Sequence, residues 1–480
     1  MSANWPKVTL EEAGVTLIDC DHKTPKAKEK GFPYVGIPQL KNGHITLDGA
    51  RLISEEDFYH WRRKAKPMPN DVILSRRCNP GETAYVPEGL EIALGQNLVL
   101  LRSDGSKLYP PFLRWVVQGS DWWNEVRKFI NVGAVFDSLK CSDIPKFEIR
   151  LPPLQEQKTI SKVLGELDQK FELNRQTNQT LEQIAQAIFK SWFVDFDPVR
   201  AKIAAREAFI QQHPEVTEEA ISDAAGTEGD TLDHAGSKAC ELAAMCAISS
   251  KTEEQLNELS ADALRQLRAT AALFPDALVE SELGKVPEGW ELKTFGDVSR
   301  CFDSKRVPLS KKQREAKKPG DIPYYGATSI MDYIDEWLFD DIYLLLGEDG
   351  SVLKDDGTPF IQYIWGKTWV NNHAHVLQGD NGVATEQLML FMQQTNIAPY
   401  VTGAVQLKLN QRNMNSVPFI SAGKELNETF YELIKPLYEK IRNTTEETQS
   451  LEVCRDTLLP KLLSGELLVE TGEADLEQAV

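Results

Sequence analysis

Two short segments resemble parts of catalytic motifs, but each lacks a required residue. Gly366-Lys367-Thr368 is similar to the end of a phosphate-binding loop, yet Ile361 stands where that loop needs a glycine. In Cys78-Asn79-Pro80-Gly81, a glycine follows the proline where the polar–Pro–Pro–aromatic tetrapeptide of methyltransferases needs a second proline, so the segment is a turn signal. We therefore predict no catalytic residue and no cofactor bound by this chain.

The segment 369–377 is the most polar of the predicted strands. His373 and His375 are two residues apart, so on a strand both face one side and could bind a metal ion. Neither a cysteine nor a third histidine is near them in the sequence, so we predict no metal site. Asn371 and Asn372 have the side-chain type that pairs with adenine edges. A polar cluster that satisfies the end of the strand would explain them equally well.

Clusters of lysine and arginine are better candidates for binding DNA, because contacts to phosphate need positive charge. Arg76 and Arg77 follow the predicted strand 72–74, and we assign one of them to guanine. Any single charge could equally be an ordinary solvated side chain. The predicted DNA-binding residues are Lys23, Lys26, Arg62, Arg63, Lys64, Arg76, Arg77, Lys305, Arg306, Lys311, Lys312, Asn371 and Asn372.

The overall charge is unsuited to DNA, since the chain carries a formal net charge of −19. The acidic residues are unevenly distributed, however. Residues 1–150 contain 21 Lys and Arg against 19 Asp and Glu, whereas residues 201–285 contain 7 against 16. Residues 286–418 are still slightly acidic, so only local patches would favour DNA there. We expect the chain to bind DNA tightly only with a basic partner.

The elements that must position these residues occur twice. Phe32–Gly36 matches Ile322–Gly326, and at an offset of 270 residues Asp71–Leu74 matches Asp341–Leu344 and Gly133–Val135 matches Gly403–Val405. Short apolar runs broken by Gly, Pro and Asn predict strands in each copy. A long helix ends each copy, so we predict an α+β fold of two tandem mixed α/β domains, each followed by a helix.

The two helices show the same heptad pattern with the same two polar positions. Asn174 and Asn178 interrupt the apolar seam of the first helix, and Thr444 and Thr448 do so 270 residues later. Matched polar core positions favour pairing of the two helices over packing of each helix on its own domain. The predicted pairing residues are Leu164, Leu167, Phe171, Asn174, Asn178, Leu181, Leu437, Ile441, Thr444, Thr448 and Leu451.

Prolines and composition mark the predicted boundaries. The expected segments are a first α/β domain (1–150), a central helix (151–198), an acidic, partly helical linker or insertion (199–285), a second α/β domain (286–418), a distal helix (419–467) and an acidic tail (468–480).

Several motifs resemble the specificity subunits of type I restriction–modification systems. Leu151-Pro152-Pro153-Leu154-Gln155-Glu156-Gln157 is similar to the start of that family's central helix, and Ile188–Val199 to its end. Phe274-Pro275-Asp276 with Val286–Trp290 resembles the entry to the second target-recognition domain. Leu458–Leu467 resembles the family's C-terminal end.

The resemblance implies two target-recognition domains, each reading one half of a bipartite asymmetric DNA site. It implies an antiparallel coiled coil with pseudo-two-fold symmetry that sets the spacing between the half-sites. It also implies two methyltransferase subunits and two motor–nuclease subunits as partners, with S-adenosylmethionine, ATP and Mg bound on those partners. The chain would then be non-catalytic by itself. The alternative is a coiled-coil assembly scaffold without DNA specificity.

The cysteines and the absence of long apolar runs bear on location. The seven cysteines are scattered, which favours reduced thiols, and no run is apolar enough to span a membrane. The N-terminus does not resemble a secretory signal, so we expect a cytoplasmic protein.

Overall fold

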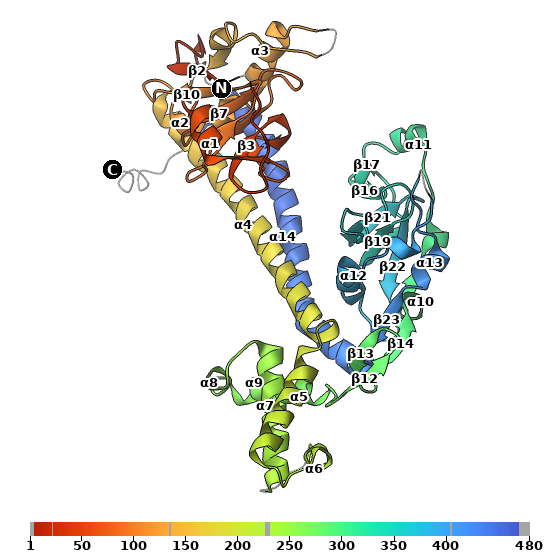
Figure 1. The fold of residues 1–480 in the computed structure, drawn as a ribbon. Coiled ribbons are helices and arrows are strands. Elements are labelled where there is room, and N and C mark those ends of the chain that lie inside the picture. The colour runs from red at the N-terminus through yellow and green to blue at the C-terminus, as the bar shows by residue number, and fades with distance from the viewer. Residues whose placement is uncertain (1–3, 22, 134–135, 226–230, 404–405, 470–480) are drawn as a thin grey trace. The chain divides into compact units, whose positions relative to one another are not determined.

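A computed structural model describes all residues except 1–3, 22, 134–135, 226–230, 404–405 and 470–480. The chain divides into two compact units (Figure 1). Unit 1 contains residues 1–175 and 444–480, and unit 2 contains residues 176–443. Each unit therefore holds one α/β domain together with parts of both long helices.

The first α/β domain is built on an antiparallel sheet with the order β2-β10-β7-β8. Its strands β7 and β10 are apolar runs that are buried on both faces, which is typical of the centre of a sheet. A smaller sheet has β3 at its centre, antiparallel to β6 and parallel to β9. The strands are β1 (Lys7–Thr9), β2 (Val15–Asp19), β3 (Phe32–Val35), β4 (Leu40–Lys41), β5 (His44–Ile45), β6 (Arg51–Ile53), β7 (Val72–Ser75), β8 (Thr83–Tyr85), β9 (Ala93–Leu94), β10 (Leu98–Ser103) and β11 (Glu148–Arg150). The helices are α1 (Glu55–Arg62), α2 (Pro110–Val116) and α3 (Ser120–Phe129).

The second α/β domain repeats this topology. Its main sheet has the order β15-β22-β19-β20, and in its smaller sheet β16 is antiparallel to β17 and parallel to β21. The strands are β12 (Leu278–Ser281), β13 (Gly284–Pro287), β14 (Glu291–Thr294), β15 (Ser299–Cys301), β16 (Ile322–Tyr325), β17 (Ile330–Ile334), β18 (Phe339–Asp340), β19 (Tyr343–Gly347), β20 (Ile361–Ile364), β21 (Lys367–Val370), β22 (Ala374–Gly379) and β23 (Pro418–Ser421). The helices are α10 (Phe295–Val298), α11 (Lys311–Glu315), α12 (Thr385–Gln394) and α13 (Gln411–Asn415).

In each domain, the strand at which the chain enters pairs with the strand at which it leaves. In the first domain β1 pairs with β11, with Lys7 opposite Arg150. In the second domain β14 pairs with β23, with Glu291 opposite Ser421. The matching order of pairings confirms the predicted duplication and the α+β class, although Ala134–Val135 and Ala404–Val405 of one sequence match lie outside the described residues.

The two long helices are α4 (Leu154–Phe193) and α14 (Lys424–Ser464). In unit 1, the Asn174 amide lies 3.1 Å from the Thr448 hydroxyl, and the Arg455 guanidinium lies over the Phe171 ring. In unit 2, the rings of Phe189 and Phe430 are 6.0 Å apart. In each unit, later residues of α4 contact earlier residues of α14, so the helices pair in antiparallel orientation.

Residues 197–272 are more helical than the linker predicted from their acidic composition. They form α5 (Asp197–Gln212), α6 (Glu218–Asp223), α7 (Leu232–Ser249), α8 (Glu253–Leu256) and α9 (Ala261–Ala272). Alanine-rich faces let α7 and α9 approach closely, and they bury Ala244, Met245 and Ala271. A small core of this kind has few large apolar residues, so the sequence pattern understates it. Gly226–Asp230 lies outside the described residues.

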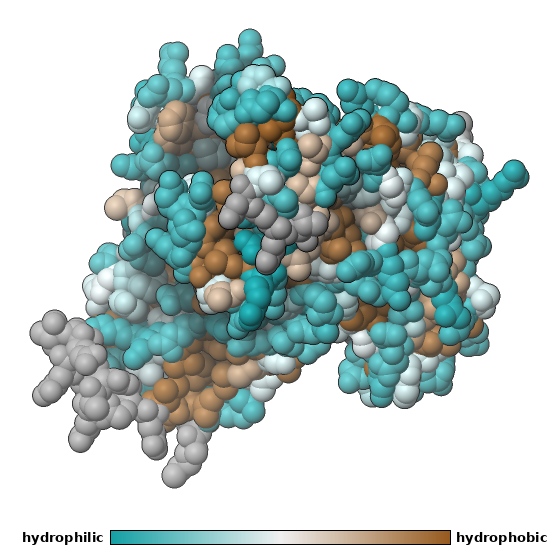
Figure 2. Space-filling view, turned by 90° about the horizontal axis from the view of Figure 1, so that it is seen from below, coloured by the Kyte–Doolittle hydropathy of each residue, from teal (hydrophilic) through white to brown (hydrophobic). Residues whose placement is uncertain are grey.

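Hydrophobic residues also reach the surface. Figure 2 shows brown areas between the hydrophilic residues on the face that it presents. Val132, Phe136, Met331, Tyr333 and Trp337 are among the exposed large hydrophobic residues. Within the described residues, none of the helices is both long enough and apolar enough to cross a membrane.

Candidate nucleic-acid interface

Three equivalent residues are joined by the same two backbone hydrogen bonds in both α/β domains. In the first domain, Arg76 N donates to Asn97 O over 2.9 Å and Leu139 N donates to Arg76 O over 2.8 Å. In the second domain, Glu348 N donates to His373 O over 2.8 Å and Leu409 N donates to Glu348 O over 2.9 Å. Arg76 and Glu348 therefore occupy equivalent positions, directly after the central strands β7 and β19.

Equivalent bridges join the next residue of each loop to a hairpin. Arg77 and Asn131 both pair with Ser138 in the first domain, and Asp349 and Thr402 both pair with Lys408 in the second. We call this region the loop–hairpin surface. It comprises residues 76–79, 131–133 and 136–138 in the first domain, and residues 347–350, 371–373, 402–403 and 406–408 in the second.

In the first domain this surface presents cationic and apolar side chains. Arg76 is 9% exposed and packs inward, whereas Arg77 is exposed. The Arg77 guanidinium lies 5.5 Å from the centre of the Phe136 ring. Val132 is 84% exposed and Phe136 is 44% exposed, which is unusual for side chains of this size. An arginine stacked on an exposed aromatic ring is held in a limited range of directions.

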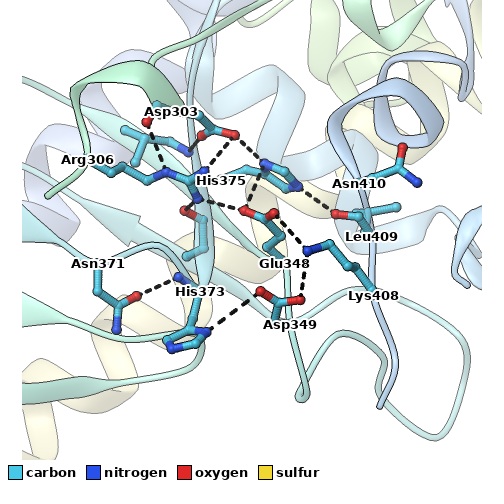
Figure 3. Close-up of polar contacts among 12 residues, drawn as sticks. Asp303, Arg306, Glu348, Asp349, Asn371, His373, His375, Lys408, Leu409 and Asn410 are labelled. Atoms are coloured by element: carbon cyan, nitrogen blue, oxygen red, sulfur yellow. Dashed lines mark hydrogen bonds and ion pairs between the residues drawn. The ribbon is translucent and has the colours of Figure 1, made fainter. Parts of the chain in front are cut away.

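In the second domain the equivalent surface carries a network of charges (Figure 3). Arg306 Nη1 lies 2.8 Å from Glu348 Oε2 and donates to Ala374 O over 2.6 Å. Lys408 Nζ lies 3.6 Å from Glu348 Oε1 and 3.3 Å from Asp349 Oδ1. His373 Nδ1 lies 3.8 Å from Asp349 Oδ2. The two carboxylates are largely covered, whereas the side chains of Lys408 and His373 are about half exposed.

His375 is the buried end of this network. Its Nδ1 lies 2.6 Å from Asp303 Oδ2, and its Nε2 lies 2.7 Å from Leu409 O. Burial works to lower the pKa of His375, but the hydrogen bond and charge of Asp303 outweigh it and raise that pKa. In turn, burial works to raise the pKa of Asp303, but the hydrogen bond and charge of His375, the bond from Val376 N and the charge of Arg306 together outweigh burial and lower that pKa. Both ring nitrogens face acceptors, so the geometry fits a protonated imidazolium.

Cys301, Asp303 and His375 also lie close enough to one another to hold a metal ion. The imidazole uses both nitrogens for Asp303 and Leu409 O, however, so it offers no free lone pair to a metal. Burial also raises the pKa of the Cys301 thiol to about 12, which disfavours the thiolate that binds metals. The cluster is better explained as an internal ion pair.

The predicted DNA-binding residues of the first domain divide into exposed and engaged side chains. Lys23, Lys26, Arg63 and Arg77 are exposed. Lys64 is half exposed, and its Nζ donates to Cys20 O. Arg62 is 9% exposed, lies over the Phe58 ring and pairs with Glu91, so its guanidinium mainly stabilises α1. Because Arg76 packs inward, Arg77 alone of this pair remains a predicted contact to guanine.

In the second domain Lys305, Lys311, Lys312 and Asn372 are exposed. Arg306 is taken up by Asp303 and Glu348. Asn371 is 3% exposed and accepts a hydrogen bond from His373 N, so little of its side chain is accessible to a DNA base. The basic segment 305–318 is also less positive than its sequence suggests, because Asp332 pairs with Arg314 and Lys318, and Glu336 pairs with Lys317.

Sequence reasoning missed Val132, Phe136, Glu348, Asp349 and Lys408. A signal for Val132, Phe136 and Lys408 was present in the sequence, because the duplicated Gly-Ala-Val segments that begin at Gly133 and Gly403 lie beside them. Comparison of the residues around those segments would have identified Ser138 and Lys408 as equivalent positions with different chemistry.

The helix-pairing residues lie where two antiparallel helices meet. Asn174 is 2% exposed and donates to Glu447 Oε2 over 2.9 Å, and Thr444 is also 2% exposed. Asn178 contacts Ile441 O. Leu164 and Leu167 of α4 belong to the core of unit 1, together with Leu458 and Leu462 of α14. Leu181, Leu437 and Ile441 belong to the core of unit 2. Leu451 is half-buried.

Comparisons with known proteins show what the chain is similar to. Residues 5–183 and 287–453 match the family model described as type I restriction modification DNA specificity domain. The chain is 29% identical over 431 residues to the type I restriction enzyme HindI specificity subunit of Haemophilus influenzae, covering 84% of this chain and 88% of that protein. It is 24% identical to the MjaIX specificity subunit of Methanocaldococcus jannaschii, covering 93% and 90%. A crystal structure of an S subunit from M. genitalium is 14% identical, with a TM-score of 0.48 and coverage of 98% and 97%. All of the helices α5–α9 lie between the two matched regions.

Proposed function

The chain belongs to the type I restriction–modification specificity-subunit family and recognises DNA sequence, and on this premise we propose that each α/β domain reads one half of a bipartite, asymmetric site. The observation that carries the proposal is the repeated backbone frame with unlike surface side chains. Equivalent positions hold Arg77 in one domain and Asp349 in the other. Two domains that present different side chains on the same backbone frame would select different bases.

Site selection with the assembled complex tests this proposal. Random duplexes would be selected with the chain and its methyltransferase partner, and methylated adenines would be mapped in a host that carries the system. Two short conserved blocks separated by a spacer of fixed length and free sequence are expected. A single continuous consensus, or no consensus, would contradict the proposal. The absence of any consensus would favour a scaffold without DNA specificity.

We propose further that the paired helices set the length of that spacer. Asn178 of α4 contacts Ile441 of α14, so one heptad can be inserted into both helices at facing positions. Seven residues add about 10 Å to a helix, which corresponds to roughly three base pairs of duplex. The selected spacer should lengthen by about that number. An unchanged spacer length in an intact complex would contradict this proposal. Insertion of the heptad into α4 alone is the control, because it shifts α4 relative to α14 and breaks their register.

The partners follow from the family. We propose that the chain is non-catalytic, works in the cytoplasm, and assembles with two methyltransferase and two motor–nuclease subunits that bind S-adenosylmethionine, ATP and Mg. The first α/β domain has only a small excess of positive charge and the second is slightly acidic, which supports a partner that supplies most contacts to phosphate. Native mass spectrometry of the co-expressed subunits would measure the stoichiometry, and a different ratio would overturn this part of the proposal.

A further inference from the structure

The loop–hairpin surface is built alike in both domains, yet its side chains differ in charge and polarity. The backbone hydrogen bond from Leu139 to Arg76 is repeated by the bond from Leu409 to Glu348. The backbone therefore has the same arrangement at these positions in both domains. The side chains that project from this frame are Arg77, Val132 and Phe136 in the first domain, and His373 and Lys408 in the second. A constant frame with variable exposed groups is what a pair of domains with different DNA targets requires.

Burial separates the supporting groups from the exposed groups in the second domain. The side chains of Glu348 and Asp349 are 15% and 18% exposed, whereas those of Lys408 and His373 are 49% and 50% exposed. Arg306 and His375 contact Glu348 from the buried side (Figure 3). The carboxylates therefore act as a fixed support from which two hydrogen-bond donors reach the surface.

The carboxylates of Glu348 and Asp349 keep Lys408 protonated. The hydrogen bond with Asp349, together with the charges of Asp349 and Glu348, raises the pKa of Lys408. Two carboxylates directly behind the ammonium group would repel a phosphate. They do not repel the edge of a base pair, where a lysine can donate to O6 and N7 of guanine. The arrangement therefore favours a base contact over a phosphate contact.

The first domain offers different chemistry at the same place. Val132 and Phe136 expose apolar surface beside the Arg77 guanidinium. In the major groove, apolar side chains contact the methyl group of thymine, and arginine donates two hydrogen bonds to guanine. Exposed apolar groups would give little affinity for the phosphates of the DNA backbone.

We propose that the loop–hairpin surface is the base-contacting and specificity-determining element of both domains, through Arg77, Val132 and Phe136 in the first half-site and through Lys408 and His373 in the second. This inference rests on the proposed bipartite function and names the residues that carry it. The occupant of the surface is the major groove of duplex DNA.

The test is site selection by the assembled complex with Lys408→Met and, separately, Phe136→Ala. Lys408→Met should weaken binding to the native site roughly ten- to hundredfold and relax base preference at one position of the second half-site only. Phe136→Ala should alter base preference in the first half-site only. Lys424→Met is the matched control, because Lys424 is an exposed lysine of the same unit that pairs with Glu428 outside this surface.

The outcomes separate this inference from the proposed function. If the unmodified complex selects no bipartite site, the proposed function fails. If it does, but Lys408→Met weakens all sequences equally with unchanged base preference, Lys408 contacts only phosphate and the inference is overturned. Unchanged selection by both variants overturns it as well. Should Lys408→Met fail to assemble, His373→Gln decides the question for the second half-site. Within the part of the chain that the structure describes, the only charged group near the exposed His373 side chain is Asp349, at 3.8 Å.

Discussion

The two α/β domains use one backbone frame but stabilise it differently. Val99 of β10 lies opposite Leu74 in the first domain, and it is fully buried among apolar residues. His375 of β22 lies opposite Leu346 at the equivalent place and is 1% exposed within a charge network. An apolar contact and a buried ion pair thus support the same strand pairing. The comparison shows that the shared fold fixes the course of the backbone. It leaves open whether apolar or charged side chains stabilise the paired strands.

The contact between domain and helix is also reversed in charge. In the first domain, Arg114 of α2 pairs with Asp168 of α4, and the Arg114 guanidinium lies 3.5 Å from the centre of the Tyr85 ring. In the second domain, Glu386 of α12 lies 3.4 Å from Arg442 of α14. Exchange of the two domains between the two helices would bring like charges together. The reversal therefore favours the correct pairing of each domain with its helix.

Reversal of charge at Arg114 should have the largest effect. Arg114→Glu places a second carboxylate beside Asp168, which is 8% exposed, and should destabilise unit 1 by about 4 kcal/mol. Denaturant unfolding followed by hydrogen exchange in α2 would measure this loss. The double variant Arg114→Glu with Asp168→Arg imitates the charge order of the second domain and should recover at least part of it. No recovery would indicate that stacking on Tyr85, rather than charge, holds the contact.

His375→Gln should come next, with a loss of about 3 kcal/mol in the second domain, because the largely covered Asp303 carboxylate would keep Arg306 but lose the imidazolium that lies 2.6 Å from it. The stability that His375 contributes is complete below its ordinary pKa of 6.5 and is lost as pH rises through the raised pKa of the folded state. The unmodified second domain should therefore lose stability above that pH, and the variant should lose this dependence. Hydrogen exchange of β22 against pH would measure both. An identical pH profile in the variant would refute the assignment of a protonated His375.

The seam between the helices should respond more weakly. Asn174→Ala removes hydrogen bonds to Glu447 and Thr448 from a position that is 2% exposed, and should cost about 1–2 kcal/mol. Gln179→Ala, at an exposed position of the same helix, should change the free energy of unfolding by less than about 0.5 kcal/mol. Thermal unfolding compares the two. Equal effects would mean that Asn174 makes no net contribution to pairing.

Among the substitutions within the two α/β domains, Arg77→Met should have the smallest effect on stability. Arg77 is exposed, and its stacking on Phe136 is a surface contact, so the loss should stay below about 0.5–1 kcal/mol. Thermal unfolding of the variant provides the measurement. A loss of several kcal/mol would show that the loop–hairpin surface of the first domain is a structural element, unlike the half-exposed Lys408 of the second.

The sequence predicted the elements better than it predicted the partners of charged side chains. Heptad spacing identified α4 and α14 because helical periodicity is local and repeats over many turns. The duplicated order of strands could be read from short matches at one offset. By contrast, Asp332 neutralises Arg314 and Lys318 from β17, a different element. Arg62 and Asn371 are polar in sequence but buried in the fold. Such pairings depend on tertiary packing, which has no local period.

The pairs β1–β11 and β14–β23 have a further consequence. Lys7 lies opposite Arg150, and Leu151 N donates to Pro6 O over 2.9 Å, so the chain enters and leaves the first domain at neighbouring points. Glu291 and Ser421 do the same for the second domain. A segment whose two ends meet in this way can be replaced by another of different length without displacing the helix that follows. New DNA targets could thus arise by exchange of whole modules between genes, while the rest of the subunit stays as it is.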